Sequence, residues 1–230
     1  MVVATVALAC ASPGAGGGGQ ANAQEEEAMP ATSQWRPLFD GNTTAGWRGY
    51  RMEGVPDGWA VVDGYLTRVA SAGDLITEEQ FGNFELALEW QVSPAGNSGI
   101  FIRATEDADR IYESGPEMQV LDDASHRDGG NLLTAAGANY GLYAVPEYSA
   151  KPAGEWNEVR ILVDGAHVEH WLNGVKVVEY QLWSPDWEAR VANSKFAEWP
   201  GYGRARRGHI GLQDHGDWVA YRNIRIREMP

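Results

Sequence analysis

Tight-turn dipeptides divide the chain into short runs in which apolar and polar residues alternate. Asp-Gly or Asn-Gly occurs in this setting three times, at Asp63-Gly64, Asp164-Gly165 and Asn173-Gly174. These pairs adopt the left-handed backbone geometry of a two-residue turn and are the strongest local signal of a β-hairpin. We therefore expect a hairpin around residue 63 and a three-stranded meander formed by residues 156–163, 167–172 and 175–180.

The alternation extends through most of the chain. In residues 84–92, apolar side chains alternate with Glu85, Ala87, Glu89 and Gln91, which is the pattern of a half-buried strand. We expect helices only in two short segments, 77–81 and 185–194. Short strands separated by turn signals every 8 to 12 residues or so indicate an all-β sandwich or barrel. A chain of 230 residues can form this as one domain, which we place at residues 35–229.

Three of the expected strands carry polar side chains opposite a face that points into the core. Residues i and i+2 of a strand share a face. Apolar pairs in segments 97–103, 117–122 and 209–215 assign the core faces to Ile100 and Ile102, Met118 and Val120, and Ile210 and Leu212. The opposite faces then present Asn97, Arg103, Glu117, Gln119, His209, Gln213 and His215. We interpret this set as a polar concave groove, and the alternative is an ordinary solvated sheet face.

Two carboxyl groups in this region could transfer protons. Glu117 shares a face with Gln119, whereas Asp122 is out of phase by one residue and needs a β-bulge to reach the groove. A pair of carboxyl groups is the usual equipment for cleaving a glycosidic bond. The acidic segment 122–128 lacks the spacing of an EF-hand, so we favour a solvated loop over a calcium site. No cofactor is predicted, and a divalent cation there remains the open alternative.

The composition of the chain argues against nucleic acid as a partner and favours sugars. With 18 Lys and Arg against 32 Asp and Glu, the net charge of −14 argues against general nucleic-acid binding. The chain has 10 Trp, and exposed Trp favours stacking ligands such as sugars. We expect Trp156 and Trp171 on sheet faces.

The N-terminal segment is similar to a targeting signal. Residues 1–9 are mostly apolar and are followed by Cys10, the single cysteine, which excludes a disulfide framework. The stretch Ala7-Leu8-Ala9-Cys10 is similar to a bacterial lipoprotein cleavage box, and a free buried cysteine is the alternative. Residues 11–34 are rich in Gly, Ala and Glu and are expected to be a disordered tether. We expect a lipid-anchored or secreted protein whose only membrane contact is the lipid, since no apolar run is long enough to span a bilayer.

An ordered series of short motifs runs through nearly the whole expected domain. It comprises Phe39-Asp40-Gly41-Asn42, Gly82-Asn83-Phe84, Asn97-Ser98-Gly99-Ile100, Glu117-x-Gln119-Val120-Leu121-Asp122, Ala136-Gly137-Ala138-x-Tyr140-Gly141, Asn193-Ser194-Lys195-Phe196 and Gly208-His209-Ile210-Gly211-Leu212-Gln213-Asp214-His215. The series resembles the 3-keto-disaccharide hydrolase domain family. One departure is Pro116, where the family has an aromatic residue.

The resemblance implies a fold and a chemistry. The fold is a concanavalin A-like jelly roll of two antiparallel sheets, with the site on the concave sheet. A ketone at sugar C3 acidifies the C2 hydrogen, so a base can remove it, the C1 oxygen leaves by β-elimination, and water then adds. Glu117 is the expected proton-transfer residue, with His215 or Asp122 as its partner. Substrate binding would fall to Asn97, Arg103, Gln119, Tyr140, Lys195, His209 and Gln213. The ketone would be made by a separate oxidoreductase.

Two other functions fit the same sequence. A non-catalytic carbohydrate-binding module would keep the aromatic and amide side chains but would not need an acid and a base. A scaffold that binds another protein predicts an exposed apolar patch instead of a polar groove.

Overall fold

The computed structural model describes residues 1–2 and 34–230. In this part of the chain, strands dominate. They are β1 (Arg36–Pro37), β2 (Trp47–Gly49), β3 (Trp59–Val62), β4 (Tyr65–Arg68), β5 (Leu75–Thr77), β6 (Phe84–Val92), β7 (Asn97–Ala104), β8 (Glu117–Leu121), β9 (Asn157–Asp164), β10 (His167–Leu172), β11 (Val175–Gln181), β12 (His209–Leu212) and β13 (Val219–Glu228). The helical elements are α1 (Pro185–Ala192) and the short 3-10 turns η2 (Ile111–Glu113), η3 (Arg127–Gly130) and η4 (Lys195–Glu198).

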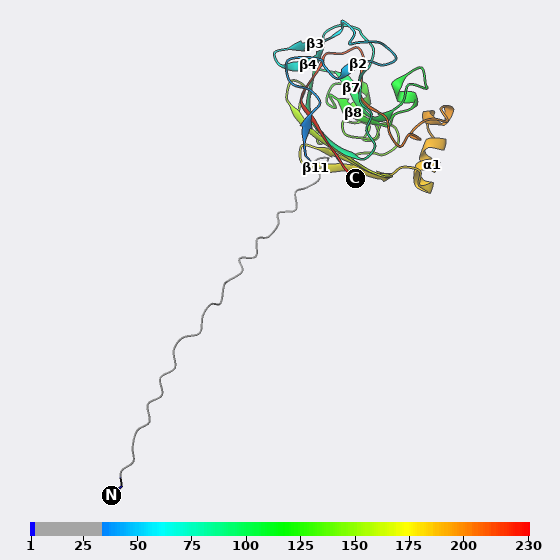
Figure 1. Cartoon of the computed structure of the whole chain (residues 1–230). Coiled ribbons are helices and arrows are strands. Elements are labelled where there is room, and N and C mark those ends of the chain that lie inside the picture. The colour runs from blue at the N-terminus through cyan, green and yellow to red at the C-terminus, as the bar shows by residue number, and fades with distance from the viewer. Residues whose placement is uncertain (3–33) are drawn as a thin grey trace.

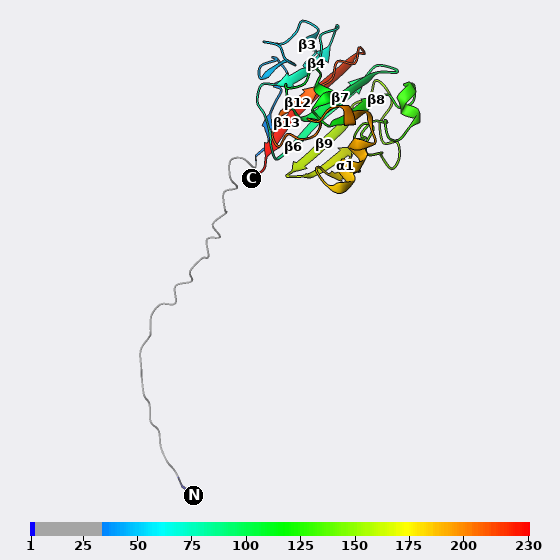
Figure 2. The ribbon, with the colours of Figure 1, turned by 90° about the vertical axis from the view of Figure 1, so that its right-hand side faces the viewer.

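The strands form two antiparallel sheets. The eight-stranded sheet has the order β11-β10-β9-β6-β13-β4-β3, and β1 pairs with β13 outside this path. The five-stranded sheet has the order β2-β5-β12-β7-β8. Helix α1 contacts β11 at the end of the larger sheet (Figure 1), and Figure 2 shows β9, β6 and β13 side by side. The expected all-β class with two antiparallel sheets is confirmed.

The three turn dipeptides lie where the alternation placed them. Asp63-Gly64 joins β3 to β4, and Asn173-Gly174 joins β10 to β11, with positive φ at all four residues. The third dipeptide, Asp164-Gly165, joins β9 to β10, with a positive φ at Gly165. Strands β9, β10 and β11 therefore form the expected meander. The turn chemistry therefore fixes the register of both hairpins.

The core lies between the sheets and follows the period of two. Strand β6 contributes Phe84, Leu86, Leu88, Trp90 and Val92 from the large sheet. The small sheet contributes Ile100 and Ile102, Met118 and Val120, and Ile210 and Leu212. All are at most 2 % exposed, so the core faces read from the sequence are confirmed.

The helix expected in residues 185–194 is present and the other is not. Ser184 caps α1 by accepting a hydrogen bond from Trp187 N, and Pro185 occupies the first turn, where no amide partner is lost. Residues 75–77 instead form β5, because they pair with both β2 and β12. Cys10 and nearly all of the expected tether, residues 11–33, lie outside the described residues. No helix in the described part is long and apolar enough to cross a membrane.

Candidate active site

The outer face of the five-stranded sheet is covered and is not a solvated surface. Every residue of β7, β8 and β12 is buried. A second small apolar cluster of Ile76, Phe101, Ala104 and Ile111 lies on this face. Ile111 comes from η2, and its side chain fills the space over Gly211 that any Cβ there would need. The solvated-face interpretation is therefore wrong, and the polar residues of this face sit in a shielded setting.

Glu117 is the most strongly perturbed acid on this face. It begins β8 opposite Phe101, and its carboxyl group leans over Gly99, where an added Cβ would overlap Glu117 Oε1. The residue is 6 % exposed. Burial raises the pKa of Glu117 to about 8, against a lowering effect of the Lys195 charge and with a further rise from Asp74. This carboxyl group is consequently poised to gain or lose a proton near neutral pH.

Lys195, Tyr140 and Gln119 surround Glu117. Lys195 Nζ lies 4.5 Å from the centre of the Tyr140 ring and 5.7 Å from that of Tyr112. Tyr140 N donates to Glu117 O at 3.1 Å, which holds the Tyr140 segment against β8. In the amide orientation that satisfies both of its polar atoms, Gln119 donates to Glu117 Oε1 and to Ser98 O, each at 3.2 Å. The structure thus brings these three predicted residues together around the carboxyl group.

Asp74 is a second acid of this face, and the sequence reasoning missed it. It immediately precedes β5, two residues before Ile76, and its charge raises the pKa of Glu117. Burial raises the pKa of Asp74 to about 6, although the amide of Asp214 donates to its Oδ1 at 3.0 Å and lowers it. The only sequence signal for Asp74 was the alternation Asp74-x-Ile76. A strand of three residues is too short to be recognised from such a periodicity.

Asn97 and Gln213 present free acceptors near the same point. Gln213 N donates to Gly99 O at 2.9 Å, so Gln213 extends β12 alongside Gly99. Asn97 Oδ1 and Gln213 Oε1 are both buried, and within the described residues neither has a hydrogen-bond partner. A buried acceptor without a partner is costly, and a ligand hydroxyl group would satisfy each of them.

His209 is buried on β12 but belongs to a different cluster. Its Nδ1 lies 2.7 Å from Thr77 O and its Nε2 lies 3.1 Å from Gln80 Nε2. Glu106, which is paired with Arg48 at 2.6 Å, approaches Nε2 to 3.8 Å. Strand β7 separates β12 from β8, so His209 is held at the β5 side of the sheet.

The expectation that Arg103 faces the groove is wrong. Arg103 has a φ of 47°, and the pairing of β7 with β12 shifts register between His209 and Gly211. This bulge breaks the alternation and turns the guanidinium group away from the face that carries Phe101. Arg103 instead donates to Gly165 O at 2.8 Å and to Gly82 O at 3.0 Å, which ties β7 to the β9–β10 turn of the other sheet.

The bulge that would turn Asp122 into the groove is absent. The β7–β8 register runs without a shift from Phe101 opposite Glu117 to Asn97 opposite Leu121. Asp122 Oδ2 accepts from Ala95 N at 2.8 Å and Oδ1 accepts from Ala124 N at 3.2 Å. Its carboxylate therefore closes the end of β8, and the expectation that it pairs with Glu117 is corrected.

His215 lies exposed beyond the end of β12. Its ring stands edge-on to that of His126 with 6.4 Å between the centroids. A role as the partner of Glu117 stays a prediction.

One group of possible metal ligands occurs in the described residues, and it lies elsewhere. His167, Glu169 and Glu179 converge on the β10–β11 edge of the large sheet. Lys176 forms ion pairs with both of these glutamates, and its ammonium group already supplies the positive charge there. In the acidic loop, Asp123 Oδ1 accepts from Ala136 N at 2.9 Å, as Asp122 does from its neighbours, so these carboxylates serve the backbone.

The chain is similar to known proteins over most of its length. Residues 34–227 match the profile of a family described as the 3-keto-alpha-glucoside-1,2-lyase-like domain. A 3-keto-disaccharide hydrolase of Bacteroides thetaiotaomicron is 40% identical over 223 residues, which cover 83% of this chain and 77% of the relative.

Solved structures show the same architecture. A crystal structure from Parabacteroides distasonis, of a protein assigned as a glycosyl hydrolase, is 31% identical with a TM-score of 0.79, covering 85% of this chain and 94% of that one. The carbohydrate-binding module CBM66 of Bacillus subtilis shares the fold alone, at 12% identity and a TM-score of 0.51 over 80% of this chain and 96% of the module. The chain therefore belongs to the 3-keto-alpha-glucoside-1,2-lyase-like domain family and is an enzyme that acts on glycosides.

Proposed function

We propose that this enzyme cleaves the glycosidic bond of 3-keto-glycosides by β-elimination followed by hydration, with Glu117 and Asp74 as its acid and base. The observation that carries the proposal is the buried carboxyl group of Glu117 over Gly99, with a pKa raised to about 8. A 3-keto sugar needs one base at C2, one acid at the leaving C1 oxygen, and a group that stabilises the C3 oxyanion.

The two acids are separated by two strands of the five-stranded sheet, β12 and β7. Gly211 pairs with Ile76 on one side and with Phe101 on the other, and Phe101 pairs with Glu117. Asp74 thus immediately precedes β5 and Glu117 begins β8, with two strands between them, and the Glu117 carboxyl group lies over Gly99 of β7. Strands are spaced about 4.8 Å apart, so β5 and β8 lie roughly 14 Å apart, and we place the sugar over β12 and β7, between the two side chains.

Their different pKa values favour distinct roles. At pH 7, Glu117 with its pKa of about 8 is mostly protonated, whereas Asp74 with its pKa of about 6 is mostly ionised. Environments that push two carboxyl groups apart in this way define an acid and a base. Asp74 would remove the C2 proton, and Glu117 would protonate the departing C1 oxygen. In the hydration step the roles reverse, because the base must then be regenerated.

Other residues of the face would bind and orient the sugar. Lys195, whose charge lowers the pKa of Glu117, would stabilise the enolate oxygen that develops at C3. Asn97 and Gln213 would accept hydrogen bonds from sugar hydroxyl groups through their unpartnered oxygens. The enzyme forms no ketone in this scheme, so its substrate would come from an oxidoreductase that acts on the same glycoside.

The test compares a 3-keto-glucoside with its unoxidised parent in D₂O. We expect release of the aglycone from the keto compound alone, with one deuterium at C2 of the freed sugar in excess of that from an enzyme-free control. Glu117→Gln should reduce turnover by roughly 10²- to 10⁴-fold while Glu198→Gln, an exposed change near Lys195, should not. Equal release from the unoxidised parent would disprove the elimination, because only the ketone acidifies C2, and binding without release would favour a carbohydrate-binding module.

A further inference from the structure

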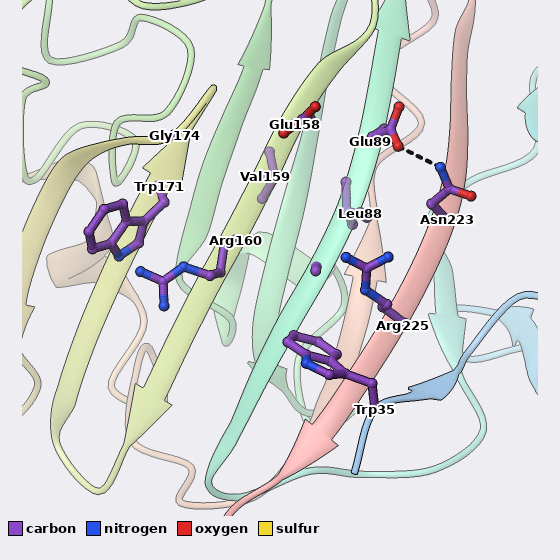
Figure 3. Close-up of a pocket in the computed structure, with 11 residues that line it drawn as sticks. Trp35, Leu88, Glu89, Glu158, Val159, Arg160, Trp171, Gly174, Asn223 and Arg225 are labelled. Atoms are coloured by element: carbon purple, nitrogen blue, oxygen red, sulfur yellow. Dashed lines mark hydrogen bonds between the residues drawn. The ribbon is translucent and has the colours of Figure 1, made fainter. Parts of the chain in front are cut away.

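A hollow lies on the sheet opposite to that of Glu117. It has a volume of about 380 Å³ and opens on the outer face of the eight-stranded sheet. Figure 3 shows its lining, with Trp171 and Trp35 at two of its sides and Arg160 and Arg225 between them. Nothing in the proposed chemistry uses these residues.

The hollow exists because the short side chain of Ala87 is surrounded by longer side chains. Ala87 lies between Glu85 and Glu89 on the outward side of β6. Directly beside it, β9 places Arg160 and β13 places Arg225. The methyl group of Ala87 therefore forms the floor of the hollow, and the side chains of Arg160 and Arg225 flank it on either side.

A chain of contacts fixes the two indoles at the rim. The Arg160 guanidinium lies 4.1 Å from the centre of the Trp171 ring and donates to Glu85 Oε1 at 2.7 Å. Glu85 also pairs with Arg227, which lies 5.2 Å from the centre of the Trp35 ring. Glu85 is 2 % exposed, so one buried carboxylate holds both arginine–tryptophan stacks in place.

Arg225 is the arginine that this network leaves free. Its guanidinium group lies 5.4 Å from the centre of the Trp35 ring, but within the described residues it forms no ion pair and donates no hydrogen bond. A register shift in β13 between Arg222 and Arg225, with Asn223 at a φ of 54°, directs Arg225 to the outer face. Figure 3 shows Arg225 directed over the middle of the hollow.

The acids of the rim differ in how far they are neutralised. Glu89 is paired with Arg222 at 2.6 Å and also accepts from Asn223. Glu158 is exposed at the upper edge of the hollow in Figure 3, and no ion pair is formed by it in the described residues. The centre of the hollow is thus basic, and one carboxylate at its edge opposes an anion.

We propose that this hollow binds a saccharide that carries a carboxylate group, separately from the catalytic face. The planar guanidinium group of Arg225 pairs with a carboxylate through two parallel hydrogen bonds. The indoles of Trp35 and Trp171, already held in position, pack against the apolar faces of the sugar rings. Uronic acid oligosaccharides combine these two features, and binding one would hold the enzyme on an acidic glycan while its other sheet acts on keto sugars.

The experiment is calorimetric titration of the full chain with tetragalacturonate, with a hyaluronan tetrasaccharide, and with the methyl ester of tetragalacturonate. We expect at least one of the two acidic ligands to bind, and the ester to bind far more weakly. Arg225→Gln should weaken binding roughly ten- to hundred-fold, and Trp171→Ala should also weaken it. Glu158→Gln should leave binding unchanged or tighten it, because it removes the opposing charge. Arg204→Gln, an exposed ion-paired arginine at another site, is the matched control.

Several results would overturn the proposal. These are failure of both acidic ligands to bind, equal binding of the ester, full binding by Arg225→Gln, or weaker binding by Glu158→Gln, which would indicate a neutral sugar. Thermal unfolding verifies that each variant is folded. Turnover of a 3-keto-glucoside by Arg225→Gln should equal that of the wild type, and a loss there would deny that the two faces act separately.

Discussion

The carboxyl group of Glu117 occupies the space that a side chain at Gly99 would fill on the neighbouring strand. Glycine in the middle of a strand weakens it and marks a site where another group approaches closely. Gly99 is paired with Gln119 and lies beside Gln213, so the gap is bordered by amides and by one buried acid. The glycine thus creates the room that the Glu117 carboxyl group occupies.

We predict that Gly99→Ala abolishes most activity while the protein still folds. The new methyl group would displace the Glu117 carboxyl from its position, and overpacking of this kind costs about 1 to 3 kcal/mol of unfolding free energy. Turnover of a 3-keto-glucoside and urea unfolding measure the two effects. Gly201→Ala is the control, since nothing lies within 4 Å of its added Cβ. Wild-type turnover by Gly99→Ala would show that the position of the carboxyl group is unimportant.

We predict that Glu117 costs the protein stability at alkaline pH. The pKa of Glu117 is about 8 in the folded state and 4.5 in its ordinary range, so folding favours the protonated form. Its stabilising effect is complete below pH 4.5 and is lost as the pH rises through 8. Glu117→Gln, which stays neutral, should therefore be more stable than the wild type at pH 9, by on the order of 5 kcal/mol. Urea unfolding at pH 5 and pH 9 tests this, and equal pH dependence in both proteins would contradict it.

Strand faces could be read from the sequence wherever the alternation was uninterrupted. Ile100, Ile102, Met118 and Val120 all point into the core as expected, because side chains alternate strictly along a regular strand. Glu117 followed from the same rule. The motif resemblance added Lys195 and Tyr140, which approach Glu117 from segments with no strand period of their own.

The failures share a physical origin in local backbone irregularity. A bulge at Arg103 turns its side chain to the opposite face of β7, and no pattern of polar and apolar residues in the sequence predicts this bulge. Asp122 lacks the bulge that it would need. Asp74 was missed because its role depends on β5 joining β12, a pairing between residues more than 130 positions apart.

We predict that Arg103 supports the fold and not the substrate. Arg103→Gln would leave Gly165 O and Gly82 O without their charged donor, and such hydrogen bonds are each worth about 1.5 to 3 kcal/mol. Urea unfolding should show the loss, while the KM for a 3-keto-glucoside should not change. Arg36→Gln is the comparison, because the exposed pair of Arg36 with Glu79 is worth about 1 kcal/mol or less. An increased KM with an unchanged free energy of unfolding would show that Arg103 binds the substrate.

We propose that the chain is held in the bacterial envelope through lipid on Cys10, and this predicts the fate of one variant. In a bacterium that processes lipoproteins, the wild type should sediment with membranes and Cys10→Ser should become soluble, because a lipid anchor depends on the thiol. Ala11→Ser, which keeps the cysteine, is the control. If Cys10→Ser stays membrane-bound, the anchor lies elsewhere.

The proposed roles of Asp74 and Glu117 predict a bell-shaped pH profile. Below a pH of about 6 the base is lost as Asp74 is protonated, and above about 8 the acid is lost as Glu117 ionises, so kcat/KM should peak between the two values. Asp74→Asn should reduce the rate by roughly 10²- to 10⁴-fold, and the remaining activity should no longer fall on the acidic side. Glu117→Gln should likewise remove the alkaline fall. Glu78→Gln, an exposed change just beyond the same strand, should keep both limbs. If Asp74→Asn retains the acidic limb, a group other than Asp74 is the base.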